Sequence, residues 1–496
     1  MSWLPTKRLS ALTWLCSTPE PRAKDTPVTY ETPPNGWRTF LIIWWTQSLS
    51  VIGSALTFFA INIWVVQSLY PRPEQKPELA IALSAITLAF GIPTMIFAPI
   101  AGAWADRHDR KLTIILSDIA SGVLSMLLIT LILAQTLQLW SLLVVLVLAA
   151  IANTFHDSAF DTSYAMLVPE AKLPRAHGMM QTIFSLSGIF SPPLAAMIIG
   201  LPALARQNPG QLPFGGSLVG LQDGTVLAIG ADVVTFLIAS TTLLFLAIPS
   251  PQRADLMVAE GQAKPSIWDD IKEGARYIWR RRPMLWLLGT FTVANFVAAP
   301  LGVLEPLIVK FNLAADWTAR GYSYETAIAL LGSVSGLGGL IGGLTMSMWG
   351  GFKRRRVYGV LLPMILSGLA MIAIGFSPFL YLTAALTAVT VAMIPFMNAH
   401  SQAIWQTQTP RELQGRVFAV RRVIAQFTFP LGTAFAGLAG FVNVGTLLMV
   451  LGAILVIFCV AQFFNPVLLR VEDKAYLDQR AARTVRTPEA DTSVEA

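Results

Sequence analysis

Long runs of apolar residues, separated by short polar stretches, fill most of the chain. A run of about 18 or more apolar residues is long enough to cross a lipid bilayer as a helix. The pattern therefore predicts twelve membrane-spanning helices. The predicted spans cover residues 39–68, 79–104, 112–134, 139–167, 178–200, 224–248, 284–309, 325–349, 357–375, 379–405, 417–440 and 443–467.

The longest polar interruption divides these spans into two sets of six. Within it Ile267, Ile271, Ala275 and Ile278 recur at helical spacing among basic residues, which predicts an amphipathic helix on the membrane surface. Such a helix would brace the two halves, and the alternative is a solvated linker. The predicted organisation is an N-terminal tail (1–38), a six-helix domain (39–248), a linker (249–283), a second six-helix domain (284–468) and a C-terminal tail (469–496).

The composition excludes several classes of protein. Hydrophobic residues make up 54% of the 496 residues and charged residues 13%, with a mean hydropathy of +0.60. Soluble domains carry about 25% charged residues, so a soluble enzyme and a disordered chain are excluded. An outer-membrane barrel is excluded because its strands would alternate apolar and polar residues. Two cysteines, Cys16 and Cys459, are too few for a disulfide framework or a metal cluster.

Basic residues are distributed unevenly between the two sides of the predicted spans. With both termini in the cytoplasm, all but five of the 35 lysine and arginine residues fall on the cytoplasmic side. This asymmetry predicts an inner-membrane protein with both termini in the cytoplasm. It also accounts for the net charge of +7 without a nucleic-acid partner. The five basic residues predicted outside are Arg72, Lys76, Arg206, Lys310 and Arg320.

The two halves contain a repeated segment. Residues 169–175 follow the fourth span, and the similar residues 410–416 follow the tenth, at an offset of 241. Parallel six-helix repeats are a transporter architecture, in which the substrate binds between the halves near the middle of the bilayer. The sequence therefore predicts an all-α integral membrane protein with two pseudo-symmetric six-helix domains. Because no nucleotide-binding loop or hydrolytic motif is visible in the sequence, we expect neither an enzyme nor a cofactor.

The loop between the second and third spans reads GAWADRHDRK, from Gly102 to Lys111. It resembles the G-x-x-x-D-R-x-x-R-K signature of the major facilitator superfamily, which implies the major facilitator fold. The residue types suit a conformational latch, because Gly102 permits close helix contact and Asp106 can lie against a helix N-terminus. Arg107 and Arg110 can pair with carboxylates across the domain interface. The alternative is an ordinary positively charged loop.

Asp118 lies near the same end of the third span, beside this loop. We expect it to form an ion pair with Arg107 or Arg110. The equivalent loop of the second half, 349–356, keeps the basic cluster but lacks the aspartate. A latch role is therefore predicted for the first of the two loops.

The fifth span contains the sequence SGIFSPPLAA at 187–196. It resembles the G-x-x-x-G-P-x-x-G-G antiporter motif of drug exporters in this superfamily, with serine or alanine in place of every glycine. Small residues four apart allow close helix packing, and proline kinks the helix. The alternative is small-residue packing without a transport role. The residues of this antiporter-like motif are Ser187, Ser191, Pro192, Ala195 and Ala196.

Four further stretches, 167–170, 175–178, 274–283 and 412–418, extend the resemblance. They resemble the macrolide-efflux and enterobactin-exporter branch of the superfamily, and the likeness covers about residues 37–468. The resemblance implies a secondary exporter driven by the proton gradient. Its expected partners are a small-molecule substrate, protons and membrane lipids, and we expect a monomer.

Ionisable residues within apolar spans are unfavourable to bury and mark candidate functional sites. On the fourth predicted helix Asn153, Asp157 and Asp161 share one face, with His156 beside them. Two carboxylates one turn apart cannot easily both be ionised, so we expect this pair to carry the proton and His156 to relay it. The candidates for proton coupling are His156, Asp157, Asp161, Asp232 and Glu305.

The offset of 241 maps Asp157 onto Asn398 and Asp161 onto Gln402 in the tenth span. Both symmetry-related helices therefore carry a polar stripe, and in the superfamily these helices line the central cavity. The alternative is hydrogen bonding between helices without a ligand. The candidates for the substrate cavity are Gln47, Asn62, Asn153, Asn295, Asn398 and Gln402.

These observations predict a proton-coupled exporter of an amphiphilic small molecule, of the drug, macrolide or siderophore class, that works by alternating access. One alternative is an uncoupled or lipid-type carrier, such as a lysophospholipid flippase. A second is a membrane sensor or scaffold without transport. The buried carboxylates favour coupling, and a scaffold has little need of a polar stripe in the middle of the membrane.

Overall fold

The computed structural model describes residues 33–207, 215–248, 267–410 and 413–477, and within these ranges every regular element is a helix. Twelve helical segments of this part of the chain are long and apolar enough to cross a membrane, as predicted. In the first half the spanning helices are α1 (Gly36–Trp64), α2 (Lys76–Ala105), α3 (Arg110–Leu133), α4 (Leu139–Leu167), α5 (Leu173–Gln207) and α7 (Thr225–Leu244). In the second half they are α10 (Arg282–Ala298) with α11 (Leu301–Leu307), α13 (Tyr324–Trp349), α14 (Arg356–Phe376), α15 (Leu380–Gln408), α16 (Gln414–Ala436) and α17 (Val444–Phe463).

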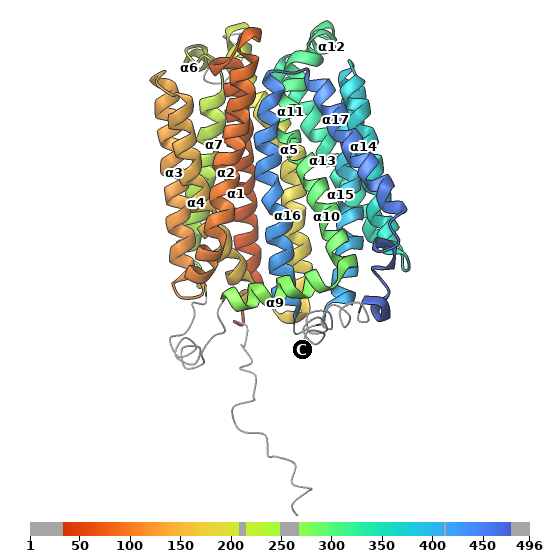
Figure 1. Cartoon of the computed structure of the whole chain (residues 1–496). Coiled ribbons are helices and arrows are strands. Elements are labelled where there is room, and N and C mark those ends of the chain that lie inside the picture. The colour runs from red at the N-terminus through yellow and green to blue at the C-terminus, as the bar shows by residue number, and fades with distance from the viewer. Residues whose placement is uncertain (1–32, 208–214, 249–266, 411–412, 478–496) are drawn as a thin grey trace, which may run out of the picture.

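Short helices lie at the two ends of this bundle. The helices α6 (Gly215–Val219) and α12 (Ala314–Ala319) lie at one end, and α9 (Ile267–Arg280) lies at the other (Figure 1). We call these ends the α12 side and the α9 side. Single π-helical turns, η1 and η4, extend the first and seventh spans. The short turns are η1 (Val65–Leu69), η2 (Pro73–Gln75), η3 (Glu170–Lys172), η4 (Ile308–Asn312), η6 (Gly437–Gly440) and η7 (Leu468–Arg470).

The helices form two domains that repeat the same packing. In the first domain α2 packs against α4, α3 against α7, and α1 against α5. In the second domain the corresponding pairs are α13 with α15, α14 with α17, and α10 with α16. Figure 1 shows α3, α4 and α7 at one side of the molecule and α14, α15 and α17 at the other, with α5 and α16 near the middle. This arrangement is the twofold repeat that the 241-residue offset predicts.

The seventh span differs from the single helix predicted over 284–309. Its helix is interrupted after Ala298, and α11 begins at Leu301. Pro300 has no N–H group to donate and its ring crowds the preceding turn, so a continuous helix is unfavourable here. The interruption leaves Glu305 on a short helical segment near the α12 side.

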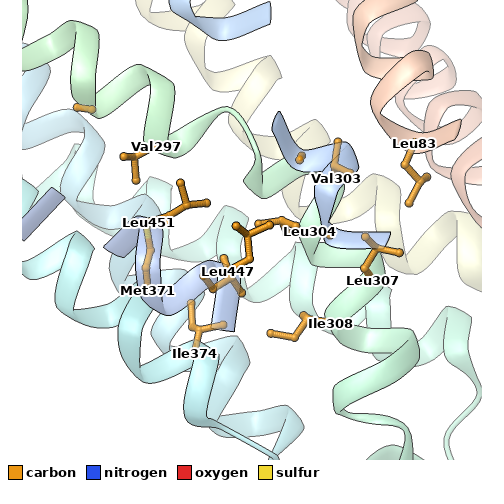
Figure 2. Close-up of a cluster of buried hydrophobic side chains, with 14 of the residues drawn as sticks. Leu83, Val297, Val303, Leu304, Leu307, Ile308, Met371, Ile374, Leu447 and Leu451 are labelled. Carbon is orange, nitrogen blue, oxygen red and sulfur yellow. The ribbon is translucent and has the colours of Figure 1, made fainter. Parts of the chain in front are cut away.

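Buried apolar side chains join the two domains on the α12 side. One large cluster includes Leu83 of α2, Val303 and Leu307 of α11, and Leu447 of α17 (Figure 2), and α2 packs directly against α11. A second cluster contains residues of the first domain alone and lies toward the α9 side. It comprises Phe40, Ile43, Ala105, Ile114, Ile115, Ala159, Phe160, Tyr164, Leu167, Val168, Ala176, Leu243 and Ile248. The domains therefore share a hydrophobic core on the α12 side.

The helix α9 occupies the stretch in which the sequence predicts an amphipathic helix. It crosses the α9-side ends of α16 and α10 (Figure 1). Gly274 allows close approach to α16, because a Cβ atom there would lie 2.7 Å from Arg416 O. Tyr277 donates its hydroxyl to Gln408 O at 2.6 Å. The rest of the predicted linker, 249–266, and most of the predicted tails lie outside the described residues.

Candidate functional site

A histidine on α4 lies between two carboxylates from different helices. His156 Nδ1 is 3.3 Å from Asp157 Oδ1 on the same helix, and His156 Nε2 is 3.4 Å from Asp118 Oδ1 on α3. Gln47, on α1, places its Oε1 atom 3.1 Å from the same Nε2 atom. Asn153 donates to Asp157 Oδ2 at 3.0 Å, one turn along α4. We call these five residues the histidine cluster.

The geometry of α4 explains this arrangement. Consecutive residues of an α-helix are turned by about 100°, so His156 and Asp157 point in different directions. The Asp118 side chain is 1% exposed and the His156 side chain 15%, whereas the Asp157 side chain is 62% exposed. Phe160 stacks against the imidazole ring with 6.0 Å between the ring centres. The cluster therefore connects an exposed carboxylate to a buried one through an imidazole ring.

The structure changes two expectations for these aspartates. Asp118 pairs with His156, so its predicted ion pair with Arg107 or Arg110 is wrong. Asp157 has Asn153 and His156 as its hydrogen-bond partners, while Asp161 is exposed one turn further along α4. The carboxylate that shares the histidine with Asp157 is thus Asp118 on α3. Sequence reasoning missed this pairing because the two residues lie on different helices.

The loop between α2 and α3 differs in detail from the predicted latch. Asp109 caps α3 by accepting a backbone N–H of its first turn at 2.9 Å, so it takes the position expected for Asp106. The preference of helix N-termini for aspartate could have identified Asp109. A Cβ atom on Gly102 would meet no described atom within 4 Å, so the predicted close helix contact at this glycine is absent from this conformation. Asp106 and Arg107 are exposed.

The next two basic residues attach the loop to the first domain. Arg110 is buried and donates to Ala105 O at 3.1 Å and to Thr162 O of α4 at 3.4 Å. Lys111 donates to Leu244 O, the last residue of α7, at 2.9 Å. A cation at a helix C-terminus satisfies a free carbonyl and the helix dipole. In this conformation both residues therefore contact the first domain, and the predicted pairing across the domain interface stays a prediction.

A second buried carboxylate, Asp232 of α7, lies among hydroxyl groups. Thr57 and Ser54 of α1 donate to it at 2.9 and 3.2 Å, and Ser125 of α3 donates at 3.5 Å. Gly53 allows α1 to approach, because a Cβ atom there would lie 2.9 Å from Asp232 Oδ1. A buried carboxylate needs such donors in place of water. The spacing of serine and threonine on α1 could have indicated this site.

The polar residues predicted on the second domain form a different arrangement. Gln402 of α15 accepts a hydrogen bond from Arg421 of α16 at 2.8 Å. The guanidinium of Arg421 also lies 5.2 Å from the ring centre of Trp405. Asn295 donates to a backbone carbonyl of α16 at 2.8 Å, and Asn398 is exposed. Sequence reasoning missed Arg421, although an arginine within the apolar stretch of α16 is a signal of a functional group.

Two other candidates lie apart from these groups. Asn62 donates to Phe58 O of its own helix at 2.8 Å. Glu305 of α11 has a buried Oε1 atom that no described residue hydrogen-bonds. The structure therefore brings together Gln47, Asn153, His156 and Asp157, predicted for the cavity and for proton coupling, with Asp118, which was predicted beside the latch.

The antiporter-like motif of α5 contacts both domains. Ser191 donates to a backbone carbonyl of α1 at 3.5 Å and lies 3.2 Å from the hydroxyl of Ser187. On the other side α5 packs against α13 of the second domain. A Cβ atom on Gly332 of α13 would lie 3.2 Å from Pro192 Cγ, and Ser333 donates to a carbonyl of α5 at 2.9 Å. The small residues thus permit close packing, while a role in antiport stays a prediction.

Two lysines join the domains on the α12 side. Lys310, in η4 of the second domain, donates to Val66 O and Tyr70 O at the end of the first span, at 2.7 Å each. Lys76, at the start of α2, donates to Val442 O beyond α16 at 2.7 Å. We call these contacts the lysine ties. Together with the shared hydrophobic core, they hold the domains together on the α12 side.

The sequence model of the Major Facilitator Superfamily matches residues 43–433. The chain belongs to this superfamily. It is a multi-pass membrane transporter, and the match covers the first domain and most of the second.

Several relatives within the superfamily are efflux proteins. Macrolide efflux protein A of Streptococcus pyogenes is 26% identical over 82% of this chain and 90% of its own length. The protein of the same name from Enterococcus faecalis is 27% identical over 71% of this chain and 99% of its own length. The multidrug efflux pump Tap of Mycolicibacterium fortuitum is 26% identical over 80% of this chain and 88% of its own length.

Solved transporter structures share the fold. A nucleoside transporter in a mutant form superposes with a TM-score of 0.64 at 12% identity, covering 86% of this chain and 99% of that one. A bacterial homologue of the human lysosomal transporter Spinster, in an inward-facing and unoccupied conformation, has a TM-score of 0.57 at 15% identity, covering 92% and 98% of the two chains. At such identities the likeness shows the fold alone.

Proposed function

We propose that this transporter is a proton-coupled exporter of amphiphilic small molecules that works by alternating access. The α9 side, which carries most of the basic loops, faces the cytoplasm of a cell whose inner membrane holds the protein. The efflux relatives support export of a drug-like substrate. The observation that carries the proposal is the position of His156 between Asp118 and Asp157.

The histidine cluster has the groups that proton transfer requires. Asp157 is exposed and can exchange a proton with water. From Asp157 the proton passes to His156 Nδ1, and the proton on Nε2 passes to Asp118. When both ring nitrogens carry protons, the imidazolium donates to both carboxylates, whereas the neutral ring has one donor only. The state of the ring therefore changes the attraction between α3 and α4.

The exposed carboxylates also suit a cationic or polar group of an amphiphilic substrate. Asp157 and Asp161 lie on one face of α4, and a positively charged group can pair with either when it is ionised. A proton on Asp157 removes that charge. Proton and substrate then compete for the same carboxylate, which is the requirement for antiport.

The test is transport by the full-length protein in proteoliposomes with an imposed pH gradient. A fluorescent cationic amphiphile serves as the probe substrate. His156→Gln and Asp157→Asn should abolish accumulation against the substrate gradient and retain exchange down it. His108→Gln, which alters an exposed histidine of the α2–α3 loop, is the matched control.

Two results would contradict the proposal. Accumulation by His156→Gln at the wild-type rate would exclude this histidine from the proton path. Substrate movement by the wild-type protein that a protonophore leaves unchanged would instead support an uncoupled carrier.

A further inference from the structure

A groove opens where the amphipathic helix α9 meets the membrane-spanning helices α10 and α16. Its volume is about 690 Å³. The residues that line it are apolar apart from Arg282 and Thr292, and the Thr292 hydroxyl already donates to a carbonyl of its own helix at 2.9 Å. Ligand sites in proteins have volumes of roughly 300–1,000 Å³, so the groove is large enough to hold a molecule.

Small residues keep this groove open. Gly289 of α10 lines it, and a Cβ atom there would meet no described atom within 4 Å. Ala275 lines it from α9. Trp279 and Trp286 border it with side chains that are 71% and 43% exposed. Tryptophan is enriched at the boundary between lipid and water, which places the mouth of the groove at that level.

The length of the groove matches one leaflet of a bilayer. It extends along α10 from Arg282, where the helix begins, to Thr292. Ten residues of α-helix span about 15 Å, which is half of the ~30 Å hydrocarbon core. An acyl chain of the leaflet on the α9 side therefore fits along the groove with its headgroup at Arg282.

The charge at the mouth favours an anionic headgroup. The last turns of α9 and the start of α10 carry Arg276, Arg280, Arg281 and Arg282, whereas the acidic residues of α9 lie in its first half. Glu273, the last of these acidic residues, pairs with Arg416 of α16. The N-terminus of α10 adds its positive helix dipole. Basic pockets between membrane helices on the cytoplasmic side bind anionic lipid headgroups.

We propose that this groove binds one anionic phospholipid of the leaflet on the α9 side. Its phosphate lies beside Arg282 at the N-terminus of α10, and one acyl chain lies along Gly289 as far as Thr292. The lipid fills the space between α9 and the second domain, and so fixes the amphipathic helix on its membrane surface. This site is separate from the histidine cluster, which belongs to the first domain.

The test measures lipid retained by the purified full-length protein. The protein is placed in bilayer nanodiscs of phosphatidylglycerol and phosphatidylcholine in equal amounts and with identical acyl chains. It is then extracted gently, and the lipids still bound are counted by native mass spectrometry. The wild-type protein should retain one phosphatidylglycerol in preference to phosphatidylcholine by about fivefold, as expected for one arginine at the membrane surface.

Two kinds of variant separate the acyl chain from the headgroup. Gly289→Leu and Ala275→Leu fill the groove from different helices, and each should remove retention of both lipids. Arg282→Gln should leave phosphatidylcholine retained and remove the preference for phosphatidylglycerol. The matched controls are Gly343→Leu, at another glycine whose added Cβ would meet no described atom within 4 Å, and Arg354→Gln, at another exposed arginine.

The readout includes folding. Each variant is compared with the wild-type protein by size-exclusion profile and thermal unfolding. Because leucine is a better helix former than glycine, Gly289→Leu is not expected to destabilise α10 through its backbone. Retention of phosphatidylglycerol by both groove-filling variants at the wild-type level would overturn the proposal. So would displacement of the lipid from the wild-type protein by the transported probe, which would assign the groove to the substrate.

Discussion

The buried aspartates of the first domain differ in how their charge is compensated. Asp232 has three hydroxyl donors, which stay uncharged at any physiological pH. Asp118 faces His156, which gains a charge when it takes up a proton. The environment of Asp118 can therefore change during a transport cycle, while that of Asp232 stays constant. On this argument we assign Asp118 to the proposed proton path, whereas Asp232 holds α1, α3 and α7 together.

This difference leads to a stability prediction for Thr57. Thr57→Val keeps the shape of the side chain but removes the shortest of the three donors to Asp232. We expect a loss of about 1–3 kcal/mol in the free energy of unfolding, because a buried carboxylate loses a donor. Thermal unfolding in detergent measures it, with Thr94→Val as the control, since that hydroxyl donates only to its own helix. Equal destabilisation by both variants would show that the hydrogen bond to Asp232 contributes no more to stability than a hydrogen bond within one helix.

Part of the site could be predicted at the scale of residues. Helical periodicity placed Asn153 and Asp157 on one face of α4, and in the structure the two side chains are hydrogen-bonded to each other. Periodicity contains no information about which helices are neighbours. The contacts of His156 with Asp118 and Gln47 therefore could not be predicted, because they join α4 to α3 and α1.

At the scale of elements, the short helix α12 depends on one aspartate. Asp316 accepts two hydrogen bonds from Arg320, at 2.9 and 3.0 Å, and a third from the Leu380 N–H at the start of α15. A helix of six residues has little stability of its own. Asp316 therefore holds α12 against the start of α15.

The same aspartate gives a pH-dependent prediction. The hydrogen bonds from Arg320, and then that from Leu380, lower the pKa of Asp316 below its ordinary value. Its contribution to stability is therefore present above about pH 4, the ordinary carboxyl range, and is lost as the pH falls through the lowered pKa. Asp316→Asn should unfold at a lower temperature than the wild-type protein near neutral pH, and the difference should shrink in acid. A difference that stays constant down to about pH 3 would contradict this account.

The elements themselves were largely predictable, because hydrophobic length determines which segments span a membrane. All twelve spans are confirmed. The exception is the break at Pro300, where the apolar pattern continues although the backbone cannot. The apolar run over 284–309 indicated a membrane span correctly. Of its two prolines, Pro300 lies at the interruption and Pro306 lies within α11.

At the scale of the whole molecule, the two domains repeat their packing but differ in charge. The face of α4 carries Asp157 and Asp161, whereas the equivalent positions of α15 are Asn398 and Gln402. Gln402 is hydrogen-bonded by Arg421, so the second domain presents a cation where the first presents carboxylates. The two domains therefore share their helix arrangement, while the polar groups at equivalent positions differ in charge. In the proposed function the carboxylates of the first domain bind the proton or the cationic group of the substrate, and the amide and guanidinium groups of the second domain suit a polar group of the same molecule.

The domains are joined on the α12 side, and these contacts stabilise the conformation that is closed on that side. Lys310 and Lys76 each donate to backbone carbonyl oxygens of the other domain, and both ammonium groups lie within 6 Å of the ring centre of Phe311. Hydrogen bonds from a charged group contribute about 1.5–3 kcal/mol each. In the alternating-access cycle that we propose, the domains separate here, so these bonds break when the α12 side opens. The lysine ties therefore set the balance between the two states.

This balance yields the last prediction. Lys310→Met keeps much of the side-chain length but removes both bonds to the end of the first span. Each 1.4 kcal/mol changes a population ratio about tenfold, so the variant should raise the share of molecules open on the α12 side by about tenfold or more. Spin labels at Thr136 and Phe379, exposed residues of the two domains on this side, report the distance between the domains. Lys353→Met, in an exposed loop of the α9 side, should leave the distance distribution unchanged. If Lys310→Met gives the wild-type distribution as well, the shared apolar core alone holds the α12 side closed.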